Sequence, residues 1–505
     1  MKKHATKIVS LTLVLLMLLG CFAACKKDDA GSADSESKTG GEIVQGSDVG
    51  SQDASDSLQN GLALDENGYV KDTLPETYDF NGKDFTILQW DNSRHEFISQ
   101  DEAAANMVNR AKFDSQARVE KRFNVKFNVL LEPGDWDHRV SFMERLGASV
   151  AVGSGTYDLV CEYSSAAGIG AYNGYLRDIR SLEYVNLEMP WWPQHLLSSA
   201  TIGENVYYCA GDINAETQIA YMYAHFVNLD MYDQYKIADL VDGRSIFEVV
   251  DDGDWTLETF TRMAIGTTGN DVSTVGFTWG NDTFVDAYLY AGGFNAVKTT
   301  NGTLSLDPSL SSSKMSTWLE NCQKLFSDIA HPSDVAGRSD AFEQGLSLFT
   351  GDYAAKAEAL SADGVVDFSI LPIPKYDKDQ EHFYSCMGLY STLISVPNDI
   401  KDETMTGMIL EGLASQAHRT VKDVVYYDIF QTRYAAAKDS DGARMFDLAY
   451  NSVTFDVARV FSAQFNVWGV FRGAAYNSAN TWSSIYAAQS EDWKIATSEL
   501  YAKLG

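Results

Sequence analysis

The chain has 505 residues, of which 70 are acidic and 39 basic, and its formal net charge is −31. A surface this acidic excludes nucleic acid and anionic membrane surfaces as partners and favours neutral or cationic small molecules. Single hydrophobic cores stop growing at about 250–300 residues, so a chain of this length is expected to fold as two lobes.

The first 24 residues have the pattern of a bacterial lipoprotein signal peptide. Three early lysines precede an apolar stretch, residues 8–19, that is too short to span a bilayer comfortably. Two lipobox-like sequences follow, one ending at Cys21 and one at Cys25. The abrupt change to charged residues favours lipidation at Cys25, and the leucine three positions before Cys21 keeps that site as the alternative. An ordinary cleaved signal with incidental cysteines is the third possibility.

Residues 25–75 are predicted to form a disordered tether. The segment is dominated by Ser, Asp, Gly, Ala, Glu and Gln, and such a composition cannot bury enough apolar surface to offset the entropy of ordering. As a random coil of about 50 residues, it would span on the order of 40 Å. A lipid anchor followed by this tether would hold a folded domain near a membrane without spanning it.

From residue 78 onward, strands and helices are predicted to alternate. Apolar runs and period-two alternation predict strands at 84–90, 125–131 and 157–163, with amphipathic helices at 108–123 and 140–150. Strands separated by helices pair in parallel through right-handed crossovers. The predicted fold class is therefore α/β, with an open sheet.

The ends of the first and third predicted strands are candidate ligand-binding positions, because ligands of open α/β sheets lie beyond the carboxyl ends of the strands. Trp90, Asp91 and Asn92 follow the first strand, and Glu162 and Tyr163 end the third. Each group offers an aromatic ring beside hydrogen-bonding atoms, the combination that sugars require. The alternative is that Trp90 only fills the edge of the sheet.

Four cysteines lie beyond the N-terminal pair, at positions 161, 209, 322 and 386. They are far apart in the sequence and form no CxxC motif, which favours buried free thiols over a disulfide framework or a zinc site. Two acidic turns, at 251–254 and 439–442, lack the complete spacing of a calcium-binding loop and are interpreted as solvated turns. No metal or cofactor is predicted.

The order of several motifs resembles that of the extracellular solute-binding proteins typified by maltose-binding protein. Behind the lipobox come Gly155–Val160, Asn228–Asp230, Asp254–Thr256, Phe349–Tyr353 and Phe368–Pro372. The third motif departs from the family pattern, since no proline precedes it and the tryptophan comes before the threonine. Stretches between 426 and 456 resemble Gram-positive lipoprotein members, and the resemblance covers residues 78–505.

The resemblance implies a two-lobed fold, each lobe an open mixed sheet flanked by helices, joined by crossing hinge strands. Lobe one would comprise 78–206 with about 386–440, and lobe two about 212–383 with 441–505. The crossings would fall near 206–212 and 383–389. Cys209 and Cys386 could then lie close together, and a disulfide between them would stiffen the hinge.

The resemblance also implies that aromatic side chains from both lobes hold the ligand. Carried over by position, Tyr353 and its neighbour Asp352 match a stacking ring and a polar contact in lobe two. Trp279 and Asp282 lie where the family often places similar contacts. One of the three tryptophans of the C-terminal helices, Trp468, Trp482 and Trp493, is expected to reach the ligand, and Trp468 is the predicted one.

The predicted function is capture of a carbohydrate, with an oligosaccharide as the favoured interpretation, by lobe closure and its delivery to the permease of an ABC importer. The protein is expected to be a monomer on the extracellular face of the cell membrane, without catalytic residues. Three alternatives stay open: a binding protein for another solute such as a peptide, a surface adhesin, and a glycan-active enzyme, which needs only two carboxylates distant in sequence.

Overall fold

The computed structural model describes residues 58–59, 62–267, 274–326, 340–435 and 440–505. All of them belong to one compact unit that begins at Ser57. The predicted signal peptide, both candidate lipidation cysteines and most of the predicted tether lie outside the described residues. Within the described ranges, no helix is long and apolar enough to cross a membrane.

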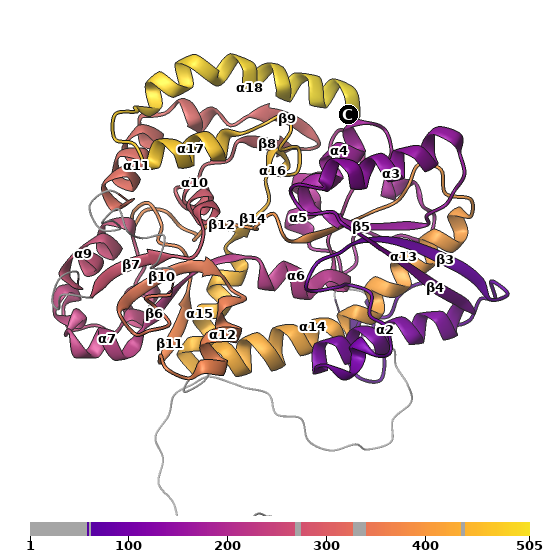
Figure 1. Cartoon of the computed structure of the whole chain (residues 1–505), viewed down its shortest axis with the longest axis horizontal. Helices are drawn as coiled ribbons and strands as arrows, with labels where there is room; N and C mark the ends of the chain where they lie inside the picture. Colours follow the sequence, from indigo (N-terminus) through magenta and orange to yellow (C-terminus); the bar gives the residue numbers. More distant parts are fainter. Residues whose placement is uncertain (1–57, 60–61, 268–273, 327–339, 436–439) are drawn as a thin grey trace, which may run out of the picture. The chain divides into compact units, whose positions relative to one another are not determined.

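Lobe one contains a four-stranded sheet with the strand order β13-β5-β3-β4 (Figure 1). Its strands are β3 (Lys83–Trp90), β4 (Val125–Glu132), β5 (Leu159–Tyr163) and β13 (Thr392–Ser395). β3 pairs in parallel with β4 and β5, which confirms the predicted parallel α/β order. β13 arrives from far along the chain and pairs antiparallel to β5, so the sheet is mixed.

Helices cover this sheet: α2 (Met107–Phe123), α3 (Arg139–Val152), α4 (Ser164–Tyr172), α5 (Gln194–Ala200) and α13 (Glu403–His418). α2 begins after Asn106, whose side chain accepts a hydrogen bond from the backbone of Asn109, and ends at Asn124 in the left-handed region. Its buried face includes Val108 and Phe123, as the apolar spacing predicted.

Lobe two contains a second four-stranded sheet with the order β11-β6-β10-β7. Its strands are β6 (Tyr223–Asn228), β7 (Val275–Trp279), β10 (Ser347–Tyr353) and β11 (Phe368–Leu371). β10 pairs in parallel with β7 but antiparallel to β6, and β6 also pairs antiparallel to β11. The second sheet is therefore mixed as well, and the predicted two-lobed α/β class is confirmed.

Shorter elements and helices complete lobe two and the C-terminal region. The helices are α7 (Leu229–Gln234), α8 (Ile246–Asp251), α9 (Leu257–Thr267), α10 (Asp286–Ala291), α11 (Ser313–Lys324), α12 (Lys356–Asp363), α15 (Ser440–Asn451), α16 (Val457–Val460), α17 (Val467–Ala475) and α18 (Trp482–Leu504). β8 (Val297–Thr300) and β9 (Thr303–Leu306) form a hairpin, and β12 (Ser385–Cys386) pairs with β14 (Val453–Thr454). α14 (Val421–Asp423) leads into a π-helix at Val424–Ala435.

Two neighbouring segments cross between the lobes, and a third crossing runs through α14 and the π-helix (Figure 1). Met222 pairs antiparallel with Met387, and the backbone N–H of Gly388 donates to the carbonyl of Tyr221 at 2.8 Å. The second crossing falls within the predicted 383–389. The first lies further along the chain than predicted, because Cys209 still pairs with Ile394 of the lobe one sheet. Helix α6 (Ala215–Ala220) follows before the chain crosses.

All four described cysteines are buried and free, which confirms the prediction of free thiols. Cys209 is paired through its backbone with lobe one, whereas Cys386 belongs to β12 and pairs with β14. The disulfide suggested by the family resemblance is therefore not formed.

The predicted tether is too long at its C-terminal end. Residues 62–75 pack onto lobe one, where Val70 and Leu74 are buried in its hydrophobic core. Asp72 forms an ion pair with Arg122 at the end of α2, with an N–O distance of 2.8 Å. The average composition of the segment predicted disorder because it contains only a few such apolar and charged residues among many small polar ones.

Candidate ligand-binding site

A cavity of about 620 Å³ lies between residues of the two lobes. Lobe one contributes Trp136, Asp137 and Tyr163; lobe two contributes Thr283, Asp286 and Tyr353; the second crossing contributes Leu389 and Tyr390; the C-terminal helices contribute Ser462, Asn466, Trp468 and Arg472. A volume of this size is typical of small-molecule sites.

Aromatic side chains form much of the cavity wall. Tyr390, on the crossing segment, meets Tyr163 of lobe one edge-on at a ring-centroid distance of 5.6 Å. The same ring lies 6.5 Å from that of Tyr353 in lobe two. Tyr390 and Trp136 each remain more than two-fifths exposed, so their faces are available to a ligand.

Tyr353 is held in place at the end of β10. Its ring stacks on Tyr223 at 4.7 Å, and its hydroxyl accepts a hydrogen bond of 3.1 Å from the Tyr223 hydroxyl. Tyr223 also shares a hydrogen bond of 2.7 Å with Thr283. A Cβ at Gly388 would lie 2.2 Å from the Tyr353 ring, so only glycine allows the ring to pack against the crossing segment.

The floor of the cavity carries a buried group of charges. Asp286, at the start of α10, lies 3.2 Å from Arg459 Nη1 through Oδ2 and 3.4 Å from Arg472 Nη1 through Oδ1. Burial raises the pKa of Asp286, and the two arginines only partly oppose this effect.

Three polar atoms of this group lack a hydrogen-bond partner among the described residues: Asp286 Oδ1, Arg459 Nη2 and Arg472 Nη1. Buried polar atoms in native proteins are normally hydrogen-bonded. Asp286 and Arg472 line the cavity. Asp286 Oδ1 and Arg472 Nη1 are ion-pair partners of each other at 3.4 Å, so the group beside the cavity is a loosely bonded charge cluster.

Three of the residues predicted from the sequence line this cavity: Tyr163, Tyr353 and Trp468. Trp90 does not line it. It lies behind Tyr163, with a ring-centroid distance of 5.4 Å, and its indole N–H donates to Thr392 Oγ1 at 3.1 Å. Trp90 thus supports the aromatic wall from within the core.

Glu162 does not line this cavity. Its side chain is fully buried, and one carboxylate oxygen accepts a hydrogen bond from the hydroxyl of Ser395. Burial raises the pKa of Glu162 well above its ordinary value. Successive residues of a strand point to opposite faces of the sheet. Tyr163 therefore reaches the cavity, while the side chain of Glu162 lies on the other face.

Asp91 and Asn92 lie away from the cavity, in the loop that follows β3. Asp91 contacts His95 Nε2 at 3.2 Å, and Asn92 Oδ1 accepts from the backbone N–H of Arg94. Neither belongs to the cavity lining. The loop turns toward the hinge instead of the ligand site.

The remaining predicted residues of lobe two also lie outside the lining. Trp279 donates its indole N–H to the Tyr476 hydroxyl at 3.1 Å, and Asp352 accepts from the backbone N–H of Tyr353 at 2.7 Å. Asp282 lies one turn before Asp286.

Sequence reasoning overlooked Asp286 and Arg472. Arg472 lies four residues after the predicted Trp468 on α17, and positions four apart share one face of a helix, so this spacing was an available signal. Asp282 and Asp286 belong to successive short helices, and only Asp286 lines the cavity.

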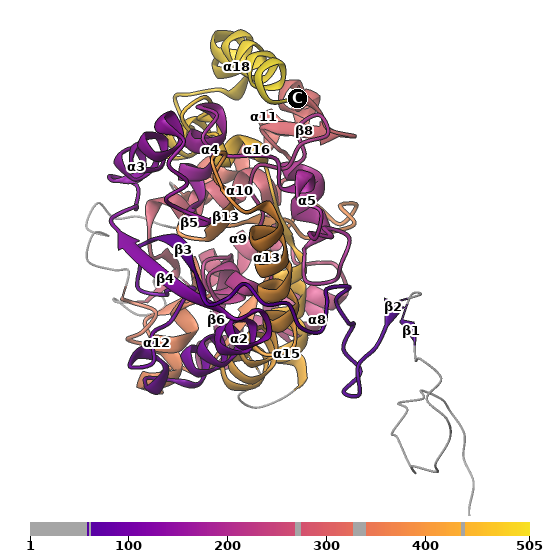
Figure 2. The same cartoon turned by 90° about the vertical axis from the view of Figure 1, so that its right-hand side faces the viewer.

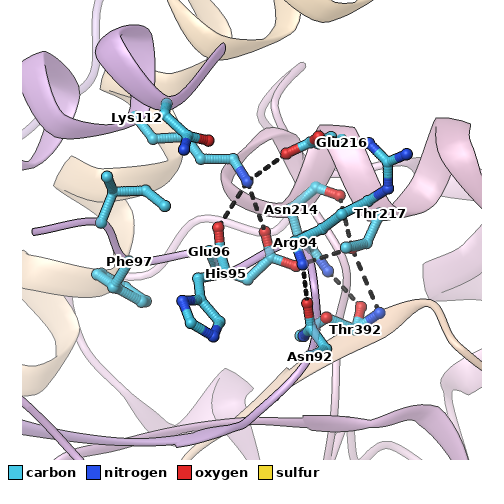
Figure 3. Close-up of polar contacts among 12 residues, drawn as sticks. Asn92, Arg94, His95, Glu96, Phe97, Lys112, Asn214, Glu216, Thr217 and Thr392 are labelled. Atoms are coloured by element: carbon cyan, nitrogen blue, oxygen red, sulfur yellow. Dashed lines mark hydrogen bonds and ion pairs between the residues drawn. The ribbon is translucent and has the colours of Figure 1, made fainter. Parts of the chain in front are cut away.

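A second polar group lies at the hinge (Figure 3). The ammonium group of Lys112 is almost completely buried and donates to Glu216 Oε2 and to the carbonyl of His95, each at 2.6 Å. Arg94 donates to Glu216 Oε1 at 2.7 Å and extends to Glu358 of α12 in lobe two. Burial alone would raise the pKa of Glu216, but the two cations hold it below the ordinary value.

These features define the class of protein by its fold. The chain has the two-lobed fold of the solute-binding proteins of ABC transporters, which confirms at the level of the fold the resemblance found in the sequence. No protein-family model and no curated protein sequence matches the chain.

Several solved structures share this fold. A cyclic α-maltosyl-1,6-maltose binding protein from Arthrobacter globiformis matches with a TM-score of 0.56 and 11% identity, over 83% of this chain and 99% of its own. A cyclo/maltodextrin-binding protein in complex with maltotetraose matches at 0.55 and 14%, over 82% and 98%. The galacto-N-biose/lacto-N-biose I-binding protein from Bifidobacterium longum matches at 0.54 and 12%, over 85% and 99%.

Proposed function

We propose that this protein is an extracellular solute-binding protein that captures an oligosaccharide between its two lobes and delivers it to an ABC importer. One observation carries the proposal. The inter-lobe cavity combines aromatic walls from both lobes with the polar side chains of Asp286, Asn466 and Arg472. Sugars bind through this combination, because their C–H faces pack on aromatic rings while their hydroxyls need donors and acceptors.

The structural neighbours support a carbohydrate ligand. Their solved complexes include maltotetraose and lacto-N-biose. The floor of the cavity suits neutral hydroxyl groups, which both donate and accept. A hydroxyl can donate to the Asp286 carboxylate and accept from the Arg472 guanidinium, whose mutual contact at 3.4 Å is longer than a short hydrogen bond.

Capture would proceed by closure of the lobes about the crossing segments at 221–222 and 387–388, beside which the chain crosses once more through α14 and the π-helix. Residues 441–505 are assigned to lobe two. A ligand that contacts both walls favours the closed arrangement by its differential affinity for the two states. Tyr390 lies on a crossing segment and lines the cavity, so it couples ligand contact to the hinge.

The N-terminal sequence supports attachment to the outer face of the cell membrane through a lipid on Cys25 or Cys21. Two acyl chains anchor a protein stably where one does not. In this arrangement the folded unit would act next to a permease without spanning the membrane itself. We propose that it acts as a monomer and without catalysis.

A thermal-shift screen of mono- and oligosaccharides tests the proposal. A bound sugar at about one hundred times its Kd adds about 2.7 kcal/mol to the free energy of unfolding, and Tm rises accordingly. We expect a shift with at least one oligosaccharide, which chromatography then recovers unchanged. Release of a shorter sugar would indicate an enzyme, and a shift with peptides alone would overturn carbohydrate capture.

Two matched variants test whether the ligand binds in the cavity. Asp286→Asn changes the carboxylate at the floor, and Asp282→Asn changes a carboxylate one turn earlier that does not line the cavity. The proposal expects the thermal shift to be clearly smaller in the first variant and unchanged in the second. Equal shifts in both would place the ligand elsewhere.

A further inference from the structure

One buried arginine contacts two residues of the ligand cavity without lining the cavity itself. Nη1 of Arg459 lies 3.2 Å from Asp286 Oδ2, and its Cζ lies 5.4 Å from the centroid of the Trp468 ring. Asp286 and Trp468 both line the cavity, whereas Arg459 does not. The Arg459 side chain is only 7% exposed, so a ligand in the cavity meets its charge only through these two neighbours.

The backbone around Arg459 is fixed from several sides. Arg459 belongs to α16, a helix of four residues whose N-cap is Asp456. The Asp456 carboxylate accepts a hydrogen bond of 3.0 Å from the backbone N–H of Ala458 within the helix. It also accepts from Ala296 at 2.6 Å and from Val297, at the start of β8, at 3.3 Å. α16 packs against both α4 and β8 (Figure 2), and these contacts fix the point from which the Arg459 side chain extends.

The second arginine beside Asp286 is held differently. Arg472, on α17, lies 3.4 Å from Asp286 Oδ1, and its side chain is 26% exposed. Arg472 also lines the cavity, so a ligand hydroxyl can compete for its guanidinium. Arg459 is therefore the fixed cation beside Asp286, and Arg472 is the cation that a ligand can engage.

Asp286 needs a fixed cation because its carboxylate is buried. Its side chain is 1% exposed, and burial raises its pKa, an effect that both arginines oppose. Removal of Arg459 would take away one positive charge, so the pKa of Asp286 would rise further. A charged carboxylate accepts stronger hydrogen bonds than a neutral carboxyl does. Loss of Arg459 would therefore weaken the cavity floor as an acceptor for hydroxyl groups.

We propose that Arg459 is a positioning residue of the ligand site, which holds Asp286 and Trp468 in place and keeps the Asp286 carboxylate charged for ligand hydroxyl groups. The inference rests on the proposed function, because it concerns the same cavity. It extends that function to a residue outside the cavity lining, which acts on the solute only through two residues within the lining.

A double-mutant cycle on binding tests this inference. Arg459→Met removes the guanidinium and keeps an unbranched side chain, and Asp286→Asn removes the carboxylate partner. Isothermal titration uses the oligosaccharide that gives the largest thermal shift. We expect Arg459→Met alone to weaken binding roughly tenfold, as loss of a charge-assisted hydrogen bond would, and to weaken it clearly less when Asp286→Asn is already present. Equal losses in the two backgrounds would overturn the inference.

The pH dependence of affinity distinguishes this role from a merely structural one. Affinity of the wild type should fall as the pH decreases and Asp286 takes up a proton. In Arg459→Met the fall should begin at a higher pH, because the carboxylate has lost a neighbouring positive charge. Arg459→Lys retains the charge and should return the pH profile toward that of the wild type. A profile of Arg459→Met that matches the wild type would overturn the inference.

Other titratable groups near Asp286 do not obscure this profile. Tyr223, Tyr290, Tyr476 and Cys386 surround it, and burial raises the pKa of each. They therefore stay neutral between about pH 5 and pH 8.

Asp456, whose pKa burial raises to about 6, does titrate in this range. Its contribution persists in Asp286→Asn, so the profile of that variant isolates it. Arg444→Met is the matched control for loss of an arginine. Arg444 pairs with Asp251 and Asp441 on the surface of lobe two, outside the cavity lining, and its loss should leave affinity and pH profile unchanged.

Unfolding free energies without sugar keep this inference separate from the proposed function. The stability of Arg459→Met relative to its double variant with Asp286→Asn should decrease up to a higher pH than that of wild type relative to Asp286→Asn. Arg459→Gln replaces Arg459→Met in both tests if the latter does not fold. A wild type that binds no oligosaccharide would overturn the proposed function, whereas equal pH ranges in this measurement would overturn the role of Arg459.

Discussion

Two buried carboxylates in this protein each lie between two cations, yet they differ in their bonding. At the hinge, both oxygens of Glu216 accept hydrogen bonds, at 2.6 Å from Lys112 and 2.7 Å from Arg94. At the cavity floor, Asp286 lies 3.2 and 3.4 Å from its arginines, and its Oδ1 accepts no hydrogen bond from the described residues.

Their pKa values shift in opposite directions for this reason. Short, charge-assisted hydrogen bonds offset the desolvation of Glu216 and lower its pKa, whereas burial prevails at Asp286 and raises its pKa. The difference separates a charge cluster closed by short hydrogen bonds from one with longer contacts. Both oxygens of Glu216 accept short hydrogen bonds, whereas Asp286 lies beside the cavity, where we propose that it contacts the ligand.

The largest expected effect is on stability at the hinge. Glu216→Ala leaves the buried ammonium group of Lys112 without its closest carboxylate, and breaking a buried pair in this way costs about 3–5 kcal/mol. Urea unfolding measures the change. Glu343→Ala removes the partner of Lys356 in a more exposed pair and should cost about 1 kcal/mol or less. Similar losses in the two variants would contradict the structural role of Glu216.

The pH dependence of stability should differ in sign between the two carboxylates. Since the pKa of Glu216 is lowered from 4.5, its contribution is fully present above that pH and is lost as the pH falls through its native value. Since the pKa of Asp286 is raised from 3.8, the native state binds this proton more tightly than the unfolded state does, and stability from this group decreases as the pH rises above 3.8.

Unfolding free energies between about pH 6 and pH 3 test these signs. The difference between wild type and Glu216→Ala should shrink toward low pH. Asp286→Asn should be most stable relative to wild type at the upper end of the range. If the stability of both variants relative to wild type changed in the same direction with pH, the distinction between the two carboxylates would be wrong.

For ligand affinity, the larger effect is expected at Asp286 and the smaller at Glu216, the reverse of the order expected for stability. Asp286→Asn replaces a charged acceptor at the cavity floor, and a hydrogen bond to a charged group contributes about 1.5–3 kcal/mol, which corresponds to a loss of roughly ten- to a hundredfold in affinity. Isothermal titration with the sugar that gives the largest thermal shift measures it. Affinity unchanged by this variant would argue against Asp286 as a ligand contact.

The smallest effect is expected at the rim of the cavity. Trp136 lines the cavity but is partly exposed, and the guanidinium of Arg139 lies 3.7 Å from its ring centroid. Trp136→Ala should weaken sugar binding by about 1 kcal/mol, since a single aromatic contact contributes about this much, and should barely change unfolding. A loss as large as that of Asp286→Asn would move the centre of the site from the floor to the rim.

Local patterns in the sequence determined the α/β class and most of lobe one. β3, β4 and β5 follow from their apolar runs and alternation, and the buried face of α2 follows from residue spacing, because these depend on side chains only a few positions apart. The family resemblance supplied the two-lobed arrangement, which the fold confirms.

Tertiary structure alone decided which residues face the gap. Tyr163 lines the cavity while the adjacent Glu162 is buried, and Asp286 lines it in place of Asp282. Tyr390 and Arg472 come from distant parts of the chain and meet only because β13 returns to lobe one and α17 packs beside α10. The orientation of one side chain relative to a second lobe depends on contacts between residues far apart in the chain, which periodicity and motifs do not encode.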